Sequence, residues 1–113
     1  MVHELVNEYI DAASTHGRED IEPKVSNAAH DCIVRVVVKL AKQDGGLLNL
    51  VPLLQHPVPN VRLWSAAHLL RVYPEQAESV LENIANGKGP IAFYARITLE
   101  EWRKGTLRMA GLD

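Results

Sequence analysis

Cysteine is nearly missing from this sequence of 113 residues, in which Cys32 is the one thiol. A single cysteine has no partner for an intramolecular disulfide, which excludes a disulfide-stabilised scaffold and fits a reducing cytosol. Cys32 lies in an apolar stretch with helical spacing. We therefore expect its thiol to be buried and unreactive.

Long hydrophobic runs are missing as well. The longest passes through the valines at positions 36–38, and it is far shorter than the roughly 20 apolar residues that span a bilayer. The first charged side chains are the acids Glu4, Glu8 and Asp11, whereas a secretory signal begins with basic residues. We expect a cytoplasmic protein without a membrane segment.

An excess of charge of one sign is the third absence. The chain has 12 Lys and Arg against 14 Asp and Glu, for a net charge of -2. This balance offers no attractive field to a polyanion, so we do not expect a nucleic-acid partner. The carboxyl-terminal part is locally basic, but acids interrupt it, which indicates a solvated surface; the residues are Arg96, Glu100, Glu101, Arg103, Lys104 and Arg108.

The sequence does contain apolar residues at steps of three and four, the spacing of amphipathic helices. Proline is tolerated in the first turn of a helix, and it opens four of these stretches, at Pro23, Pro59, Pro74 and Pro90. Glycine or proline follows most of them. The pattern predicts an all-α protein with about six helices, over residues 2–15, 23–44, 47–55, 59–73, 74–86 and 90–104.

The predicted helix over residues 59–73 is apolar almost all round. A helix of this kind must be covered on several sides, so we expect it in the middle of the domain. The following helix, in contrast, carries Glu75, Glu78 and Glu82 on one face. We interpret that face as a solvated stripe, because carboxylates on an exposed face stay ionised and create no proton donor.

An internal repeat organises the second half of the chain. At an offset of 30 residues the apolar positions coincide: Leu50 with Val80, Val51 with Leu81, Leu54 with Ile84, Val61 with Ile91, Leu63 with Phe93, Trp64 with Tyr94, and Leu69 with Leu99. Repeated helix–turn–helix units predict antiparallel helix pairs stacked as a short α-α superhelix. We expect one domain over residues 1–113, with helix pairs at 1–46, 47–73 and 74–105 and a fraying tail at 106–113.

The segment LLQHPVPNVRLWSAAHLLRVYPEQAESVL resembles a HEAT-like (armadillo-type) repeat, whose second helix opens with a valine and an arginine followed by an alanine pair. Those residues are Val61, Arg62, Ala66 and Ala67 here. Through residues 27–40, 56–81 and 94–107, the last ending in ITLEEWRKGTL, the chain is similar to an uncharacterised bacterial family of single-domain HEAT-like proteins, a domain of unknown function. The resemblance implies an interaction domain, since some HEAT-like relatives look like immunity proteins that block a toxin.

Two features depart from the HEAT-like pattern. The repeat is shorter than the roughly 40 residues usual for such units. Val58 stands where a capping Asn or Asp is expected. We therefore expect a stack too short to form a full superhelical array.

The five histidines do not fall at the spacing of a zinc motif, so we predict neither a metal nor a cofactor. Neither a nucleophile elbow nor a phosphate-binding glycine loop is present, so we predict no catalytic residues.

His68 can be read as a functional residue on an inner helix face or as a hydrogen-bonded histidine of the core. The core reading also explains Trp64, Tyr94 and Trp102 better than a ligand cage does.

We predict a non-catalytic protein–protein interaction module of immunity or regulatory type, because the sequence indicates a helical stack without a catalytic constellation. The second helix of each pair lines the concave face of such a stack. The predicted partner contacts are Arg62, Ser65, His68 and Arg71, flanked by Asn27, Asp31, Arg96 and Glu100. Arg62 can equally bond the carbonyls of the preceding loop. The uncapped end of the stack would allow a homodimer. The alternative is a HEAT-like enzyme or nucleic-acid-binding protein, similar to chromophore lyases or DNA glycosylases.

Overall fold

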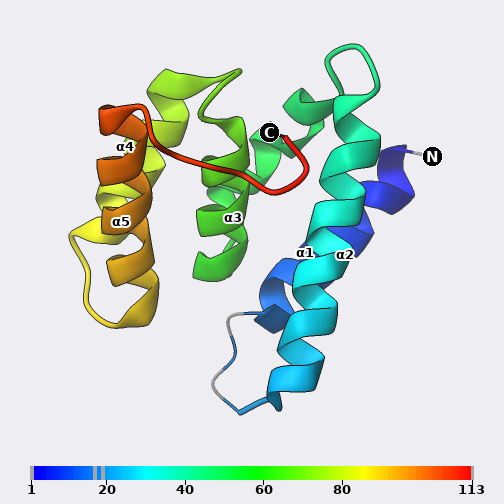
Figure 1. Cartoon of the computed structure of the whole chain (residues 1–113), viewed down its shortest axis with the longest axis horizontal. Coiled ribbons are helices and arrows are strands. Elements are labelled where there is room, and N and C mark those ends of the chain that lie inside the picture. Colours follow the sequence, from blue (N-terminus) through cyan, green and yellow to red (C-terminus); the bar gives the residue numbers. More distant parts are fainter. Residues whose placement is uncertain (1, 17, 19, 113) are drawn as a thin grey trace.

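The computed structural model describes residues 2–16, 18 and 20–112. Within them the chain forms helices and no strand (Figure 1). The elements are α1 (Val2–His16), α2 (Pro23–Ala41), the 3₁₀ helix η1 (Gly46–Gln55), α3 (Pro59–Leu69), α4 (Pro74–Ala85) and α5 (Pro90–Lys104). The prediction of an all-α fold with about six helices is confirmed.

The helices pack in consecutive pairs. Helix α1 lies along α2, η1 contacts α3, and α4 lies along α5. Figure 1 shows the pairs side by side, with α3 between the α1–α2 pair and the α4–α5 pair. The prediction of packed helix pairs is therefore confirmed.

Helix α3 is the centre of the core, as its sequence predicts. It packs against α1, η1, α4 and α5. All of its residues are buried except Pro59, Arg62 and Trp64. Burial of one large aliphatic side chain such as Leu69 stabilises the fold by about 2 kcal/mol. Because α3 buries several such side chains against helices of all three pairs, it holds the pairs together.

The prolines open their helices as the sequence predicts. Each of α2, α3, α4 and α5 has proline in its first turn, and none of the four receives a hydrogen bond from a capping side chain. The preceding residue of α3 is Val58, at the position where a capping residue is usual. The His56 ring compensates in part, because its Nδ1 accepts a hydrogen bond from the Val58 amide at 3.1 Å.

Two helix ends differ from the sequence prediction. Helix α2 ends at Ala41 instead of just before Gly45, and α3 ends at Leu69 instead of reaching Tyr73. The glycine pair serves another purpose, since Gly45 adopts a φ of 66° and an added Cβ on Gly46 would collide with the Leu40 carbonyl. The turn after α2 lets η1 fold back at once, and the turn after α3 does the same for α4.

The predicted helix over residues 47–55 forms as a 3₁₀ helix with Pro52 inside it. Proline lacks the amide proton that an α-helical turn needs, which favours the tighter form over a short length. Leu50, Leu53 and Leu54 are still buried, so the apolar positions of the repeat keep their role.

The segment after α5 contradicts the prediction that it frays. Residues 106–112 cross the molecule from the end of α5, over α3, to α2 (red in Figure 1). Met109 is 9% exposed, and the backbone of Gly111 lies against Val34 and Val38 of α2. The apolar residues Leu107, Met109 and Leu112 lack a helical period, yet they pack on the core surface and fix this crossing segment.

Cys32 also differs from its prediction. It is half-buried at the edge of the core, and its Sγ lies 3.5 Å from a guanidinium nitrogen of Arg35. None of the described helices is both long enough and apolar enough to cross a membrane.

Candidate functional site

A groove lies between α5, the end of α1 and the start of α2. Helix α3 supplies its floor, and the crossing segment supplies one wall. We call it the central groove; its lining residues are His16, Ser26, Asn60, Leu63, Trp64, Ala67, Pro90, Ile91, Tyr94, Thr98, Leu107, Arg108 and Met109. Its volume of about 620 Å³ lies in the range typical of binding pockets.

Trp64 contacts three histidines, of which His68 is buried, His30 is partly exposed and His16 lines the central groove. The His68 ring stacks on the indole at 5.6 Å and 24° between planes. The rings of His16 and His30 meet the indole edge-on at 5.2 and 5.9 Å. These contacts fix the rotamer of Trp64, so that part of the floor is rigid.

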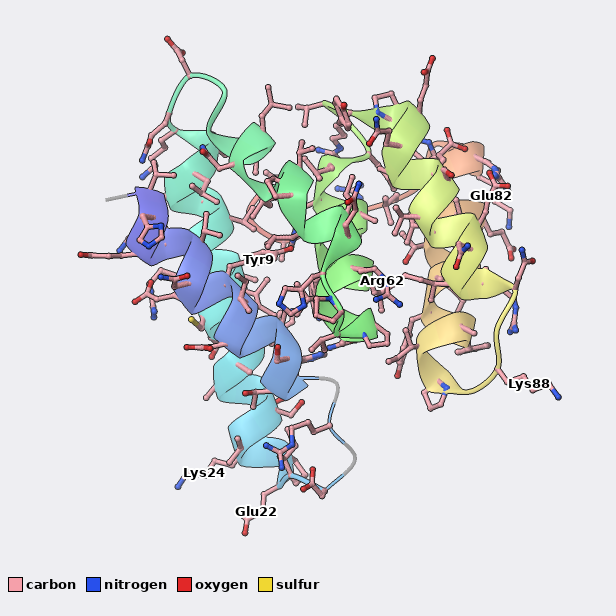
Figure 2. All side chains as sticks on the ribbon, turned by 180° about the vertical axis from the view of Figure 1, so that it is seen from behind. Tyr9, Glu22, Lys24, Arg62, Glu82 and Lys88 are labelled. Atoms are coloured by element: carbon pink, nitrogen blue, oxygen red, sulfur yellow. The ribbon has the colours of Figure 1, made fainter. Side chains whose placement is uncertain are left out.

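His68 is tied to the opposite helix by Tyr9. The Tyr9 hydroxyl and His68 Nδ1 form a buried hydrogen bond of 2.7 Å, and Figure 2 shows Tyr9 on α1, on the side toward α3. Burial lowers the pKa of His68 to about 3, although its hydrogen bond with the Trp64 backbone acts in the opposite direction. Burial also raises the pKa of Tyr9 well above its usual value. Both groups are therefore neutral at pH 7, and the reading of His68 as a hydrogen-bonded core histidine is confirmed.

Among the described residues, the histidines belong to no group that could hold a metal ion. Across residues 2–16, 18 and 20–112, no three His, Cys, Asp or Glu side chains gather in a way that could hold a metal ion. Burial, with a smaller contribution from His30, lowers the pKa of His16. The histidine that lines the central groove therefore adds little positive charge at pH 7.

Arg71 anchors the wall formed by the crossing segment. Its Nη1 donates to the Leu112 carbonyl at 3.3 Å and its Nη2 to the Leu107 carbonyl at 3.4 Å. The guanidinium thus holds both ends of the segment against α3. Arg71 was predicted to contact a partner, and here it binds the chain's own backbone.

The other predicted contacts on α3 point away from the central groove. Arg62 donates to the carbonyls of His56 at 2.7 Å and Pro57 at 3.2 Å, which confirms the structural alternative for this residue. The Ser65 hydroxyl donates to the Val61 carbonyl at 2.8 Å. Ser65 and His68 are fully buried, so a partner on the surface reaches neither, and we remove both from the contact set.

The flanking residues do not join the central groove either. Asn27 and Asp31 are exposed on α2, where the lining residue is Ser26. Arg96 and Glu100 line a separate shallow hollow between α4 and α5. Arg96 donates to the carbonyls of Ala85 and Gly87 at 3.1 Å each, so it closes the turn between these helices.

The predicted acidic stripe on α4 is engaged rather than purely solvated. Arg103 donates to Glu78 at 3.4 Å and to Glu82 at 3.1 Å. The Trp102 indole donates to Glu78 at 3.4 Å, and Glu78 is half-buried. These bonds tie α5 to α4, consistent with a structural role for Trp102.

Sequence reasoning missed the residues that actually line the floor. Asn60, Leu63, Trp64 and Ala67 lie one step around α3 from the predicted contacts. Because this helix is apolar almost all round, its periodicity could not tell the groove face from the core face. Asn60 could have indicated a contact with another element, because a polar amide in a buried helix needs a hydrogen-bond partner. Its Nδ2 donates to the Ala13 carbonyl of α1 at 2.6 Å.

The expectation that Tyr94 packs in the core is wrong. Tyr94 is 57% exposed and Phe93 is 53% exposed, although their repeat partners Trp64 and Leu63 are half-buried and buried, respectively. Helix α5 ends the described stack, so no further helix covers its outer side. Tyr94 instead forms a side wall of the central groove.

Comparison with known proteins gives one match. A family model described as a domain of unknown function, DUF2019, matches residues 3–102. No curated protein and no solved structure matches the chain significantly.

Proposed function

The chain belongs to the DUF2019 family of domains of unknown function, and from that premise we propose a non-catalytic domain that binds a segment of another protein in the central groove. The proposal includes a HEAT-like arrangement, in which the second helix of each pair faces the bound protein. It replaces the predicted contact set on α3 with the groove floor.

One observation carries the proposal, namely the chemistry of the groove lining. Trp64 of α3, Tyr94 of α5, and Arg108 and Met109 of the crossing segment line an open, largely apolar groove. Tryptophan, tyrosine, methionine and arginine are the residues enriched at the centres of protein interfaces. A solvent-filled groove lined by such side chains favours an apolar partner segment, because binding would release water from both surfaces.

The state of the buried polar groups supports a non-catalytic role. A general base or nucleophile must reach its substrate and exchange a proton near neutral pH. Tyr9 and His68 lie behind Trp64, are fully buried, and are neutral over a wide pH range. Their bond joins α1 to α3, which is a structural task.

Charge favours a protein over a nucleic acid. A strand of nucleic acid is held by several cations along its phosphates. Arg108 is the one lining residue of the central groove with a permanent positive charge. The proposal therefore takes the bound molecule to be a polypeptide.

The experiment compares two neighbouring aromatic residues. Proteins captured by the purified domain from its native host would be identified, purified, and titrated by calorimetry against the wild type, Tyr94→Ala and Phe93→Ala. Both side chains are more than half exposed, but only Tyr94 lines the central groove. We expect Tyr94→Ala to weaken binding by roughly 30-fold, the effect of losing an aromatic contact near an interface centre, and Phe93→Ala to bind as the wild type does. Equal affinity for both variants would reject the groove.

The finer form of the proposal is an antidote that blocks a toxin. The resemblance of the sequence to HEAT-like immunity proteins motivates it. Co-expression with a protein encoded by an adjacent gene tests it: the wild type should restore growth that the adjacent protein arrests, and Tyr94→Ala should not. Arrest that persists with the wild type would leave a regulatory partner as the function.

A further inference from the structure

The charge that faces the central groove has one sign, although the chain as a whole is slightly acidic. The sequence contains 14 Asp and Glu, yet none of the lining residues of the central groove is an acid. Arg108 is part of the lining, together with its chain neighbour Met109 and with Tyr94 of α5. The largely apolar lining therefore contains one permanent cation, Arg108.

Arg108 differs from the other arginines in its lack of a partner among the residues that the structure describes. Within residues 2–16, 18 and 20–112, every other arginine donates a hydrogen bond to a described group, which is a carboxylate, a backbone carbonyl or the Cys32 sulfur. Arg108 makes no hydrogen bond or ion pair with those residues. Its planar fork of donors is thus available to a bound molecule, and carboxylates match the geometry of that fork.

The crossing segment indicates which shape of polypeptide this face holds. Residues 106–109 are not helical, and the Met109 side chain is nevertheless 9% exposed. The backbone carbonyls of Leu107 and Leu112 are bound by Arg71. The same concave face thus already holds one irregular segment through an apolar side chain and an arginine.

We propose that the central groove binds an irregular peptide segment of the partner protein in which an acidic residue lies next to large apolar residues. The carboxylate pairs with Arg108, and the apolar side chains lie against Trp64 and Tyr94. This inference rests on the proposed function and adds the chemistry of the bound segment to it. The crossing segment remains in place as a wall, because Leu107, Arg108 and Met109 supply part of the lining.

The probe is a library of random dodecapeptides displayed on phage and selected against the purified full-length domain. We expect the selected peptides to be enriched in Asp or Glu within two positions of an aromatic or aliphatic residue. For such a peptide we expect Arg108→Glu to weaken binding by roughly tenfold, because one attraction of up to about 1 kcal/mol is lost and a repulsion of similar size replaces it.

Lys42→Glu is the matched control, since it changes the net charge equally at an exposed position outside the central groove. It should leave the affinity unchanged. A peptide with its acid replaced by lysine should recover affinity for Arg108→Glu. Circular dichroism would check that both variants are folded.

The outcomes separate this inference from the proposed function. Selected peptides that lose affinity with Tyr94→Ala, but show no acidic enrichment and ignore Arg108→Glu, overturn the acidic segment and leave the groove standing. Peptides that ignore Tyr94→Ala overturn the groove itself. A selection that yields no groove-dependent peptide rejects both.

Discussion

The side chains of Tyr9 and His68, 59 positions apart in the sequence, share a buried hydrogen bond of 2.7 Å. Both residues are almost completely shielded from water. In the tautomer that carries its proton on Nε2, His68 Nδ1 accepts a hydrogen bond from the Tyr9 hydroxyl, and neither group carries charge. The bond joins the first helix to the central one behind the floor of the groove.

Removing the Tyr9 hydroxyl should destabilise the fold. Tyr9→Phe leaves a buried ring nitrogen without its partner, and we expect the free energy of unfolding to fall by about 1–3 kcal/mol. Urea unfolding followed by circular dichroism measures it. Tyr94→Phe removes a hydroxyl from a side chain that is 57% exposed and should be nearly neutral; equal losses for the two variants would show that the buried bond contributes nothing.

Acid should weaken the fold through His68. Burial lowers its pKa to about 3 in the folded protein, whereas an unfolded chain binds the same proton with a pKa of about 6.5. Between these values the unfolded state binds more protons. The stabilisation is therefore complete above pH 6.5 and is lost as the pH falls toward 3, by up to about 1.4 kcal/mol per pH unit.

The measurement is the free energy of unfolding at several pH values between 7 and 4. Burial and the neighbouring His30 lower the pKa of His16, which adds a smaller loss in the same direction. His68→Gln should flatten the dependence on pH, whereas His3→Gln, at an exposed position of α1, should leave it as it is. An unchanged slope in His68→Gln would assign the acid sensitivity to other groups.

Most of the fold could be predicted from the sequence, because the helices, their proline starts and the central place of α3 follow from local chemistry and apolar spacing. The face of α3 that lines the groove could not be predicted in this way. Ser65 and His68 stand at helical spacing from Arg62, yet they face α1 and the core. An all-round apolar helix gives no local signal of orientation.

The crossing segment was missed for a related reason. Its contacts come from single apolar residues spaced without a period, such as Met109, and from Arg71 in the turn after α3, which is distant in the sequence. Tyr94 was missed because the repeat predicts burial at each matching position, but the terminal pair lacks a neighbour. In both cases the long-range contact, which the sequence pattern does not record, decided the outcome.

The amide of Asn60 should be essential to the junction between α1 and α3. Its Nδ2 donates to the Ala13 carbonyl at 2.6 Å from a nearly buried position. Asn60→Asp replaces this donor with a carboxylate that repels the carbonyl, and we expect a loss of about 2–3 kcal/mol in the free energy of unfolding. Asn27→Asp makes the same change at an exposed position of α2 and should cost little. Thermal unfolding of the two variants in parallel checks this; a tolerated Asn60→Asp would disprove the bond's importance.

The crossing segment should detach when Gly111 is substituted. Gly111 has a φ of 92°, and an added Cβ would lie 3.1 Å from a Val38 methyl carbon and 3.3 Å from the Val34 carbonyl oxygen. Gly89 has nearly the same φ of 91° with nothing within 4 Å of such a Cβ. Both alanine variants therefore carry backbone strain of about 1–3 kcal/mol, but only Gly111→Ala should also meet an over-tight contact.

Amide hydrogen exchange distinguishes these two variants. We expect Gly111→Ala to speed exchange by about tenfold or more in residues 106–112, since local opening becomes easier. Gly89→Ala should leave that segment protected. Protection of the segment in both variants would mean that its contact with α2 does not hold it.

The most direct measurement of the central claim is a two-dimensional amide and indole NMR titration of the labelled domain with a peptide selected for binding. The account predicts that the largest shift changes fall on the Trp64 indole and on the amides of Ile91, Tyr94 and Thr98. Shift changes confined to the hollow around Arg96 and Glu100, with an unmoved Trp64 indole, would contradict it.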